Sequence, residues 1–135
     1  MLVADLGKLV REALVACGCD ASEIAPLDNH GTIVVDLREL PALHIGRDGD
    51  DIWLWAYLSS RPDLLIRQHT AELLEIVMQD VAYSRTRQLQ LAESDGRMEL
   101  RCLVHPDNVL DASRFSTALD GFFSRLQAAY ERGLR

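Results

Sequence analysis

The 135-residue sequence predicts an α+β domain of two layers, in which helices cover an antiparallel sheet and the elements follow the order α-β-β-β-α-β-β-α. Three observations support this prediction. Three segments repeat apolar residues every three or four positions, as amphipathic helices do. The segments between them alternate apolar and polar residues, as strands do. Turn sequences such as Ser94-Asp95-Gly96 join neighbouring strands into hairpins. We expect residues 1–135 to form a single domain.

The first helix is expected over residues 2–17, with Gly18 as its C-terminal cap. Residues 32–38 alternate as a strand and end before Pro41. A short second strand begins at Leu43 and Ile45, and its apolar residues lead into the turn Asp48-Gly49-Asp50. These three segments start the chain with one helix and the first strands of a sheet.

The third strand, residues 51–58, is apolar on both of its faces. A second helix is expected to begin near Pro62, with Ser59 or Ser60 as its N-cap, and to reach about Val81. A hairpin follows, with strands over 88–91 and 98–104, and Pro106 ends it. The last helix is expected over 111–132, with Asp111 or Ser113 as cap.

The composition excludes several functions. Lys and Arg number 14 against 21 Asp and Glu, so the net charge is −7. Nucleic acids and anionic membranes attract a basic surface, so neither is an expected partner. No run of 18 apolar residues is present, and no signal peptide is recognised, which predicts a cytoplasmic protein without membrane insertion. Three cysteines are typical of reduced thiols.

No motif in the sequence requires an enzyme, a metal or a cofactor. Cys17-Gly18-Cys19 is a lone C-x-C pair, and the four histidines are too widely spaced for a structural zinc site. Asp48-Gly49-Asp50-Asp51 lacks the remaining ligands of an EF-hand loop. His105, Asp107 and Ser116 could be considered as a hydrolase triad. Ser116, however, lies in a predicted helix and not in the strained turn that holds a nucleophilic serine. Phosphate-binding glycine loops are absent.

The apolar surface exceeds what one helix-covered sheet needs, because the third strand is apolar on two faces. Either the domain buries this surplus by itself, or apolar surface is left for a partner; we expect a dimer or another protein partner. Trp53 and Trp55 share one face of that strand. They are either ordinary core residues or part of a shallow aromatic surface that accepts an apolar peptide, since tryptophan is enriched at binding hot spots.

Several strings, in order along nearly the whole chain, together resemble the type III secretion chaperones of the invasion protein B / SpaK family. The matching strings are Gly18-Cys19-Asp20; Leu27-Asp28-x-His30-x-Thr32-Ile33-Val34; Asp36-Leu37; Leu40-Pro41; Asp50-Asp51-x-Trp53-x-Trp55-Ala56; Leu103-Val104-His105-Pro106-Asp107; and Phe115-Ser116-Thr117-Ala118-Leu119-x-Gly121-Phe122. The agreement fades in the middle and late part of the second helix, over 82–97 and after about residue 124. The family has the same α-β-β-β-α-β-β-α order.

The resemblance implies a homodimer in the bacterial cytoplasm that binds N-terminal segments of one or more secreted effectors. The segment would wrap around the dimer in extended form and stay competent for export, with the export ATPase as a further candidate partner. It implies no enzymatic activity and no cofactor. One alternative that remains open is a dimeric cytoplasmic adaptor that binds another bacterial protein or regulator without a role in secretion. Another is a small enzyme with an unrecognised site, which substitutions at His105 and Ser116 would test.

Candidate contact residues follow from the resemblance and from the apolar pattern. The dimer contact is expected on the second helix, at Leu65, His69, Leu73, Ile76 and Val77. Effector contacts are expected on the first helix and the sheet, at Leu6, Val10, Leu14, Ile33, Val35, Leu43, Ile45, Trp53 and Trp55. Sequence alone does not separate the core residues in this set from the contact residues.

Overall fold

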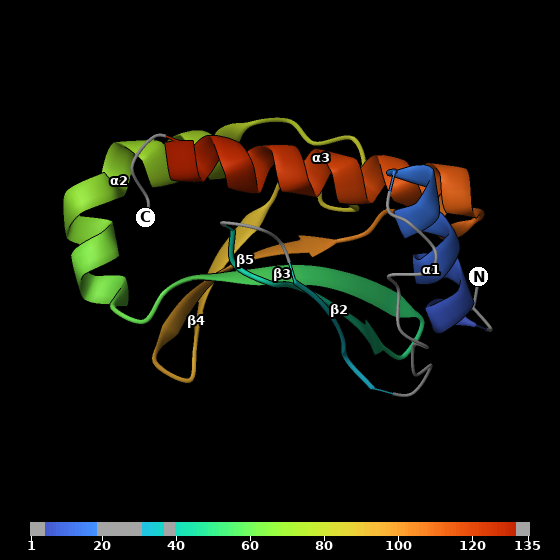
Figure 1. Ribbon diagram of the computed structural model, residues 1–135. Coiled ribbons are helices and arrows are strands. Elements are labelled where there is room, and N and C mark those ends of the chain that lie inside the picture. Colours follow the sequence, from blue (N-terminus) through green and yellow to red (C-terminus); the bar gives the residue numbers. More distant parts are fainter. Residues whose placement is uncertain (1–4, 19–30, 37–39, 132–135) are drawn as a thin grey trace.

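The computed structural model describes residues 5–18, 31–36 and 40–131, and its architecture confirms the predicted fold class and element order (Figure 1). Five strands form one antiparallel sheet in the order β1-β2-β3-β5-β4. The helices lie on one side of this sheet, and no helix of the described residues covers the other side (Figure 1). The result is the expected two-layer α+β arrangement.

The helix α1 spans Leu6–Ala16. The Asp5 carboxylate accepts a hydrogen bond from the Lys8 backbone N–H and so caps the helix start. The predicted residues 2–4 lie outside the described part of the chain. The helix ends as expected, because Gly18 follows the capping residue Cys17 with a φ of +99°, a left-handed conformation that glycine adopts easily.

The strands β1 (Ile33–Val35), β2 (Leu43–Asp48) and β3 (Asp51–Ser59) form a meander. β1 is shorter than the predicted 32–38, of which residues 37–38 lie outside the described part. β2 is longer than predicted, since its pairing with β3 continues up to Asp48 opposite Asp51. The side chains of β3 alternate strictly between buried and half-buried, so one face of the strand packs on the core.

The helix α2 spans Pro62–Met78; it begins at Pro62 as predicted, but its N-cap and its C-terminal end differ from the prediction. Its N-cap is Arg61, not Ser59 or Ser60; the Ser59 hydroxyl instead accepts a hydrogen bond from the Arg61 N–H. Pro62 occupies the first turn as predicted. The helix bends at His69, whose φ of −133° is not helical. Val81 was expected on the helix but lies beyond it, buried in the following connection.

The hairpin β4 (Gln90–Ser94) and β5 (Arg97–Leu103) turns at Asp95 and Gly96, as predicted. A 3-10 turn, η2 (Pro106–Val109), leads into α3 (Ala112–Glu131). The Asp111 carboxylate accepts a hydrogen bond from the Arg114 N–H at 2.8 Å, which confirms Asp111 as the predicted cap.

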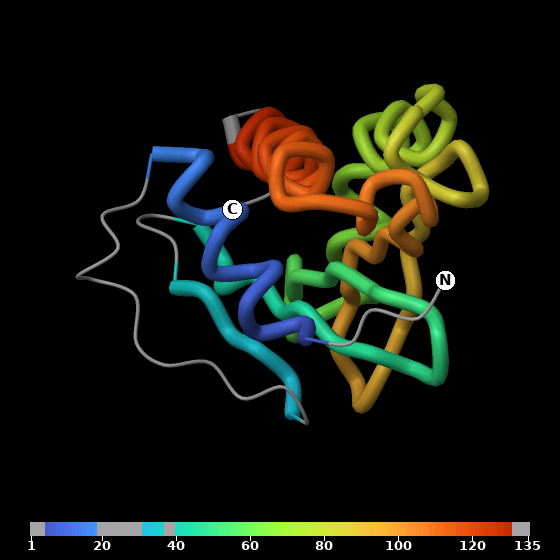
Figure 2. The backbone as a smooth tube through the Cα atoms, turned by 90° about the vertical axis from the view of Figure 1, so that its right-hand side faces the viewer, coloured from blue at the N-terminus to red at the C-terminus, as the bar shows by residue number. Residues whose placement is uncertain are grey.

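The core lies between the sheet and the helix layer. α3 crosses above the sheet, α1 packs beside it next to β1, and α2 lies at the opposite end (Figures 1 and 2). The largest fully buried side chains come from every layer: Leu6, Val10, Leu43, Ile45, Leu54, Leu89, Leu100, Phe115, Leu119, Phe122 and Leu126. The helices pack on the inner face of the sheet, so none of the helices that the structure describes covers its outer face.

Candidate functional site

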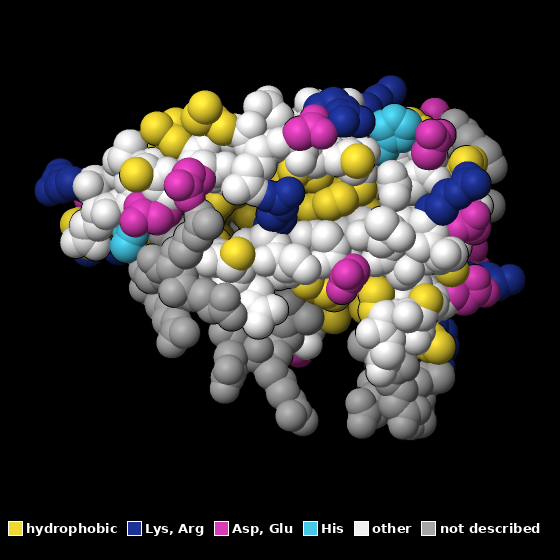
Figure 3. All heavy atoms as spheres, turned by 90° about the horizontal axis from the view of Figure 1, so that it is seen from above, with side chains coloured by type: hydrophobic (Ala, Val, Ile, Leu, Met, Phe, Trp, Pro, Cys, Tyr) yellow, Lys and Arg dark blue, Asp and Glu magenta, His cyan; other side chains and the backbone are white. Residues whose placement is uncertain are grey.

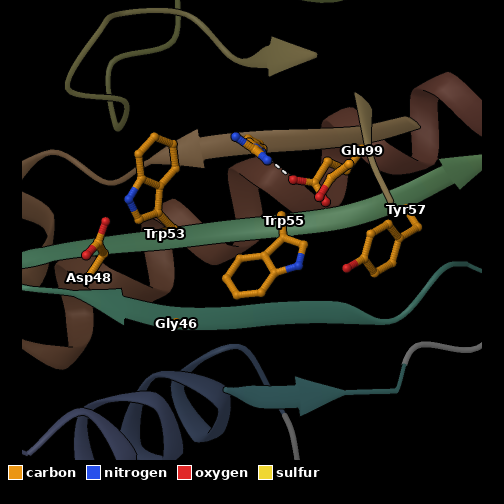
Figure 4. A pocket seen from close by; sticks show the side chains of 8 residues that line it. Gly46, Asp48, Trp53, Trp55, Tyr57 and Glu99 are labelled. Carbon is orange, nitrogen blue, oxygen red and sulfur yellow. Dashed lines mark hydrogen bonds and ion pairs between the residues drawn. The ribbon is translucent and has the colours of Figure 1, made fainter. Parts of the chain in front are cut away.

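The outer face of the sheet carries a row of aromatic side chains from one strand. Trp53, Trp55 and Tyr57 project from β3 on this face and are each half-buried (Figure 4). Their neighbours Leu54 and Ala56 project to the inner face and are fully buried. A free sheet face is usually polar in a monomeric protein, so three aromatic rings in a row indicate a surface for a partner.

The ring of Trp55 lies against the backbone of β2 because Gly46 leaves room for it. A Cβ atom at Gly46 would lie 2.8 Å from Cη2 of Trp55, closer than an ordinary contact. His44, directly opposite Trp55 in the register, stacks on it with ring centroids 5.5 Å apart and planes 24° apart. His44 also makes a T-shaped contact with Tyr57, with ring centroids 5.2 Å apart. These contacts hold the aromatic rings in place.

The neighbouring strand β5 adds charged groups to the same face. Arg97, Glu99 and Arg101 alternate along it, with Glu99 opposite Tyr57 and Arg101 opposite Trp55. Glu99 is only 4% exposed, and its carboxylate accepts a hydrogen bond from Nε of Arg101. The guanidinium carbon of Arg97 lies 3.7 Å from the ring centroid of Tyr57, a cation–π contact.

These residues border a shallow cavity of about 390 Å³ on the outer face. Its lining combines the aromatic row with Gly46, Asp48, Ser94, Glu99 and Arg101. Asp48 lies beside Trp53 at one end, whereas Glu99 and its ion pair lie beside Tyr57 at the other (Figure 4). The cavity offers apolar contact along the aromatic row, with the Asp48 carboxylate at one end and the Glu99–Arg101 ion pair toward the other. Such a lining suits a peptide better than a small reactive substrate.

A second apolar surface lies along α2. Ile66, Leu74 and Met78 are 48%, 52% and 72% exposed. Together with Leu73, Val77 and the β4–β5 residues Leu91 and Met98, the first two line a groove of about 380 Å³. Figure 3 shows hydrophobic side chains gathered on the surface at the α2 end of the molecule. We call this surface the α2 groove.

Most of the predicted effector contacts lie inside the protein. Six of the nine side chains are buried in the core of the chain itself: Leu6, Val10, Leu14, Ile33, Leu43 and Ile45. Val35 is half-buried against that core. Trp53 and Trp55 are the two that reach the open face. The effector roles of all nine residues stay predictions. Trp53 and Trp55 are half-buried on the outer face of the sheet, where a partner can reach them.

The predicted dimer contacts divide in a similar way. Leu65, Leu73 and Ile76 are buried within the chain, although Leu73 also lines the α2 groove. His69 and Val77 are half-buried. The exposed apolar side chains of α2 are those of Ile66, Leu74 and Met78, and none of them is in the predicted set. Ile66 and Leu74 belong to the apolar stripe of the helix, so the pattern located the surface without resolving which side chains remain free.

Sequence reasoning also missed the charged part of the outer face. The pattern Arg97-x-Glu99-x-Arg101 has the two-residue period that places three side chains on one face of a strand. Its significance depends on the pairing of β5 with β3, which brings these charges beside the aromatic row. His44 acquires its place in the same way, through the pairing of β2 with β3.

Groups that could have suggested catalysis have structural partners instead. The Ser116 hydroxyl donates a hydrogen bond to the Ser113 carbonyl, and Nδ1 of His105 accepts one from the Asp107 N–H. Within the described segments, no three His, Cys, Asp or Glu side chains are grouped to hold a metal ion. Cys19 and His30 lie outside those segments. Burial raises the pKa of the Cys102 thiol to about 12, which keeps it protonated and unreactive at neutral pH.

No helix in the described part of the chain has both the length and the apolar character needed to cross a membrane.

Comparison with known proteins places the chain in a family. The model of the invasion protein B family matches residues 18–95. The surface presentation of antigens protein SpaK of Salmonella typhimurium is 42% identical over 123 residues, 91% of each chain, and that of Salmonella typhi matches equally well. The chain belongs to the invasion protein B family. The resemblance stated from the sequence is therefore confirmed.

A solved structure shares the fold. One chain in the heterodimeric ExoU–SpcU complex of the type III secretion system of Pseudomonas aeruginosa superimposes with a TM-score of 0.54. The alignment covers 93% of this chain and 94% of that chain at 20% sequence identity. This likeness confirms the α+β architecture of the invasion protein B family member described here.

Proposed function

We propose that this family member is a type III secretion chaperone. It binds N-terminal segments of one or more effector proteins in extended form, keeps them soluble and competent for secretion, and helps to deliver them to the export apparatus. It acts in the bacterial cytoplasm as a homodimer, without enzymatic activity, and the export ATPase is a candidate further partner. Membership of the invasion protein B family supports the secretion role.

The single observation that carries the proposal is the open aromatic face around Trp53, Trp55 and Tyr57. An unfolded segment loses conformational freedom when it binds, so it needs a large surface with strong anchors to compensate. The rings of Trp55 and Tyr57, held by their contacts with Gly46 and His44, offer apolar contact area with little further loss of side-chain freedom, and Trp53 extends the row. Alternate side chains of an extended segment can contact such a row.

The proposed homodimer uses the α2 groove. Its exposed side chains, Ile66, Leu74 and Met78, form an apolar surface that a second copy of the chain can cover. His69 and Val77, two of the residues expected at the dimer contact, lie on the same helix. A dimer formed there leaves the aromatic face of each chain open, because that face is on the other side of the sheet from the helices (Figure 1).

The test is co-expression with the N-terminal segment of an effector encoded beside this gene, followed by mass determination in solution. The proposal expects a complex of one segment with two chains, each of 15.1 kDa. Trp53→Ala and Trp55→Ala should release the segment while the dimer persists. A dimer that leaves the segment in aggregates would contradict the chaperone function and favour an adaptor for another bacterial protein.

A further inference from the structure

The outer face of β5 carries two positive side chains and one negative side chain, so one positive charge is not compensated on this strand. Arg97, Glu99 and Arg101 share this face, so two arginines flank one glutamate along the strand. Glu99 pairs with Arg101. Among the described residues Arg97 contacts the Tyr57 ring and has no ion pair. The chain as a whole has a net charge of −7, so this local surplus is opposite in sign to the total.

The Arg101 guanidinium is held in one orientation with donors to spare. Its Nε–H is used by the Glu99 carboxylate, and within the described part of the chain its terminal N–H groups have no partner. Its side chain is 34% exposed, and it lines the cavity beside the aromatic row. A buried carboxylate costs free energy unless it is paired, so Glu99 both needs Arg101 and fixes its orientation.

We infer that this cavity binds an acidic side chain of an extended peptide segment, with its carboxylate on Arg101, which lines the cavity, and on Arg97, which lies over the adjoining Tyr57 ring, and with its apolar neighbours on Trp53 and Trp55. The inference rests on the proposed function and specifies the chemistry of the partner. Guanidinium groups recognise carboxylates through paired N–H donors. In an extended segment every second side chain faces the sheet, so apolar residues two positions from the acid lie over neighbouring rings.

The net charge of the chain does not oppose this assignment at contact distance. At physiological ionic strength, charges are screened over about 8 Å, so nearby groups dominate. The groups beside Tyr57 and Trp55 are Arg97, Arg101 and the compensated Glu99. Asp48 borders the opposite end of the cavity, beside Trp53 (Figure 4). This polarity defines which end of the face receives the acidic side chain.

The test uses three blocked nine-residue peptides in which leucine alternates with serine and the central residue is glutamate, glutamine or lysine. The indole N–H signals of Trp53 and Trp55 and the Nε–H signal of Arg101 are followed by NMR during titration of the full chain. The glutamate peptide should bind about fivefold more tightly than the glutamine peptide, and should move these three signals.

Arg97→Gln should lower affinity for the glutamate peptide by about two- to fivefold and leave the glutamine peptide unaffected. Arg101→Lys, which keeps the charge beside Glu99, should lower it by about tenfold because the paired donors are lost. Arg114→Gln is the matched control, since it removes one exposed positive charge from α3 on the helix side. It should change neither affinity.

Three results would overturn the inference: tighter binding of the lysine peptide, a glutamate preference that survives both β5 substitutions, or no movement of the tryptophan signals. These peptides are independent of any effector. A failure here therefore leaves the co-expression result intact, and a failure of co-expression leaves the peptide result intact.

Discussion

Substitutions at two adjacent residues of β3 should affect folding and binding differently, because the two side chains project from opposite faces of the sheet. Leu54 is fully buried in the core, whereas Trp55 lies on the open face. Leu54→Ala should lower the free energy of unfolding by about 2–5 kcal/mol, the range for deleting a buried leucine side chain. Trp55→Ala loses its stacking on His44 and part of a half-buried surface, which together should cost about 1–2 kcal/mol.

Binding should respond in the reverse order. Truncation of an aromatic anchor at the centre of an interface costs about 2 kcal/mol or more, which is a loss of roughly 30-fold in affinity. Leu54→Ala changes no side chain on the outer face, so the fraction that remains folded should bind normally. Urea titration followed by circular dichroism measures the unfolding free energy, and calorimetry with an effector segment measures affinity under conditions in which both variants are folded.

Equal losses of unfolding free energy in the two variants would show that Trp55 is a core residue. Undiminished affinity in Trp55→Ala would show that the segment binds elsewhere. Either result refutes the assignment of the open aromatic face as the binding surface.

Three further predictions concern other parts of the molecule. Gly46→Ala should displace the Trp55 ring, since the added Cβ would lie 2.8 Å from it, and should weaken effector binding while the midpoint of urea unfolding changes little. Leu74→Glu should convert a dimer to a monomer in light scattering, whereas Gln68→Glu, an exposed control on the same helix outside the groove, should not; a dimer that tolerates Leu74→Glu excludes the α2 groove as the contact. Burial raises the Cys102 pKa from 9.0 to about 12, so the unfolded chain loses this proton first and the free energy of unfolding should fall above pH 9, by up to about 1.4 kcal/mol per pH unit. Burial also raises the pKa values of Tyr83 and Tyr130, so urea titrations of Cys102→Ala should show a shallower fall between pH 9 and 10, and an unchanged slope would contradict the prediction.

The local pattern of apolar residues predicted the helices and strands well. The apolar stripe of α3 and the turns at Gly49 and Gly96 depend on residues that are neighbours in sequence, and the structure has the helix and both turns where the sequence predicts them. The end of α2 was harder, because Val81 continues the helical spacing but is buried in the connection that follows. The bend at His69 occurs without glycine or proline, so no local signal marked it.

The candidate site was predicted less completely. The sequence predicts that Trp53 and Trp55 share one face of a strand, but no pattern of neighbouring residues indicates whether a helix covers that face. Six other expected contacts, among them Leu6 and Ile45, are buried between α1, the sheet and α3. Arg101 and Glu99 were not considered, since their importance comes from lying opposite Trp55 and Tyr57 in the pairing of β5 with β3.

The sequence by itself determined the order of the elements, the α+β class and the family, because these depend on periodicity, turn residues and strings of neighbouring residues. Tertiary structure alone decided which apolar residues are inside. β3 is apolar on both faces, and the helices cover one of them, so four of its seven apolar residues are buried in the core and three are half-buried on the other face. That choice depends on the packing of α1 and α3 across the inner face of the sheet, which involves residues far apart in the chain.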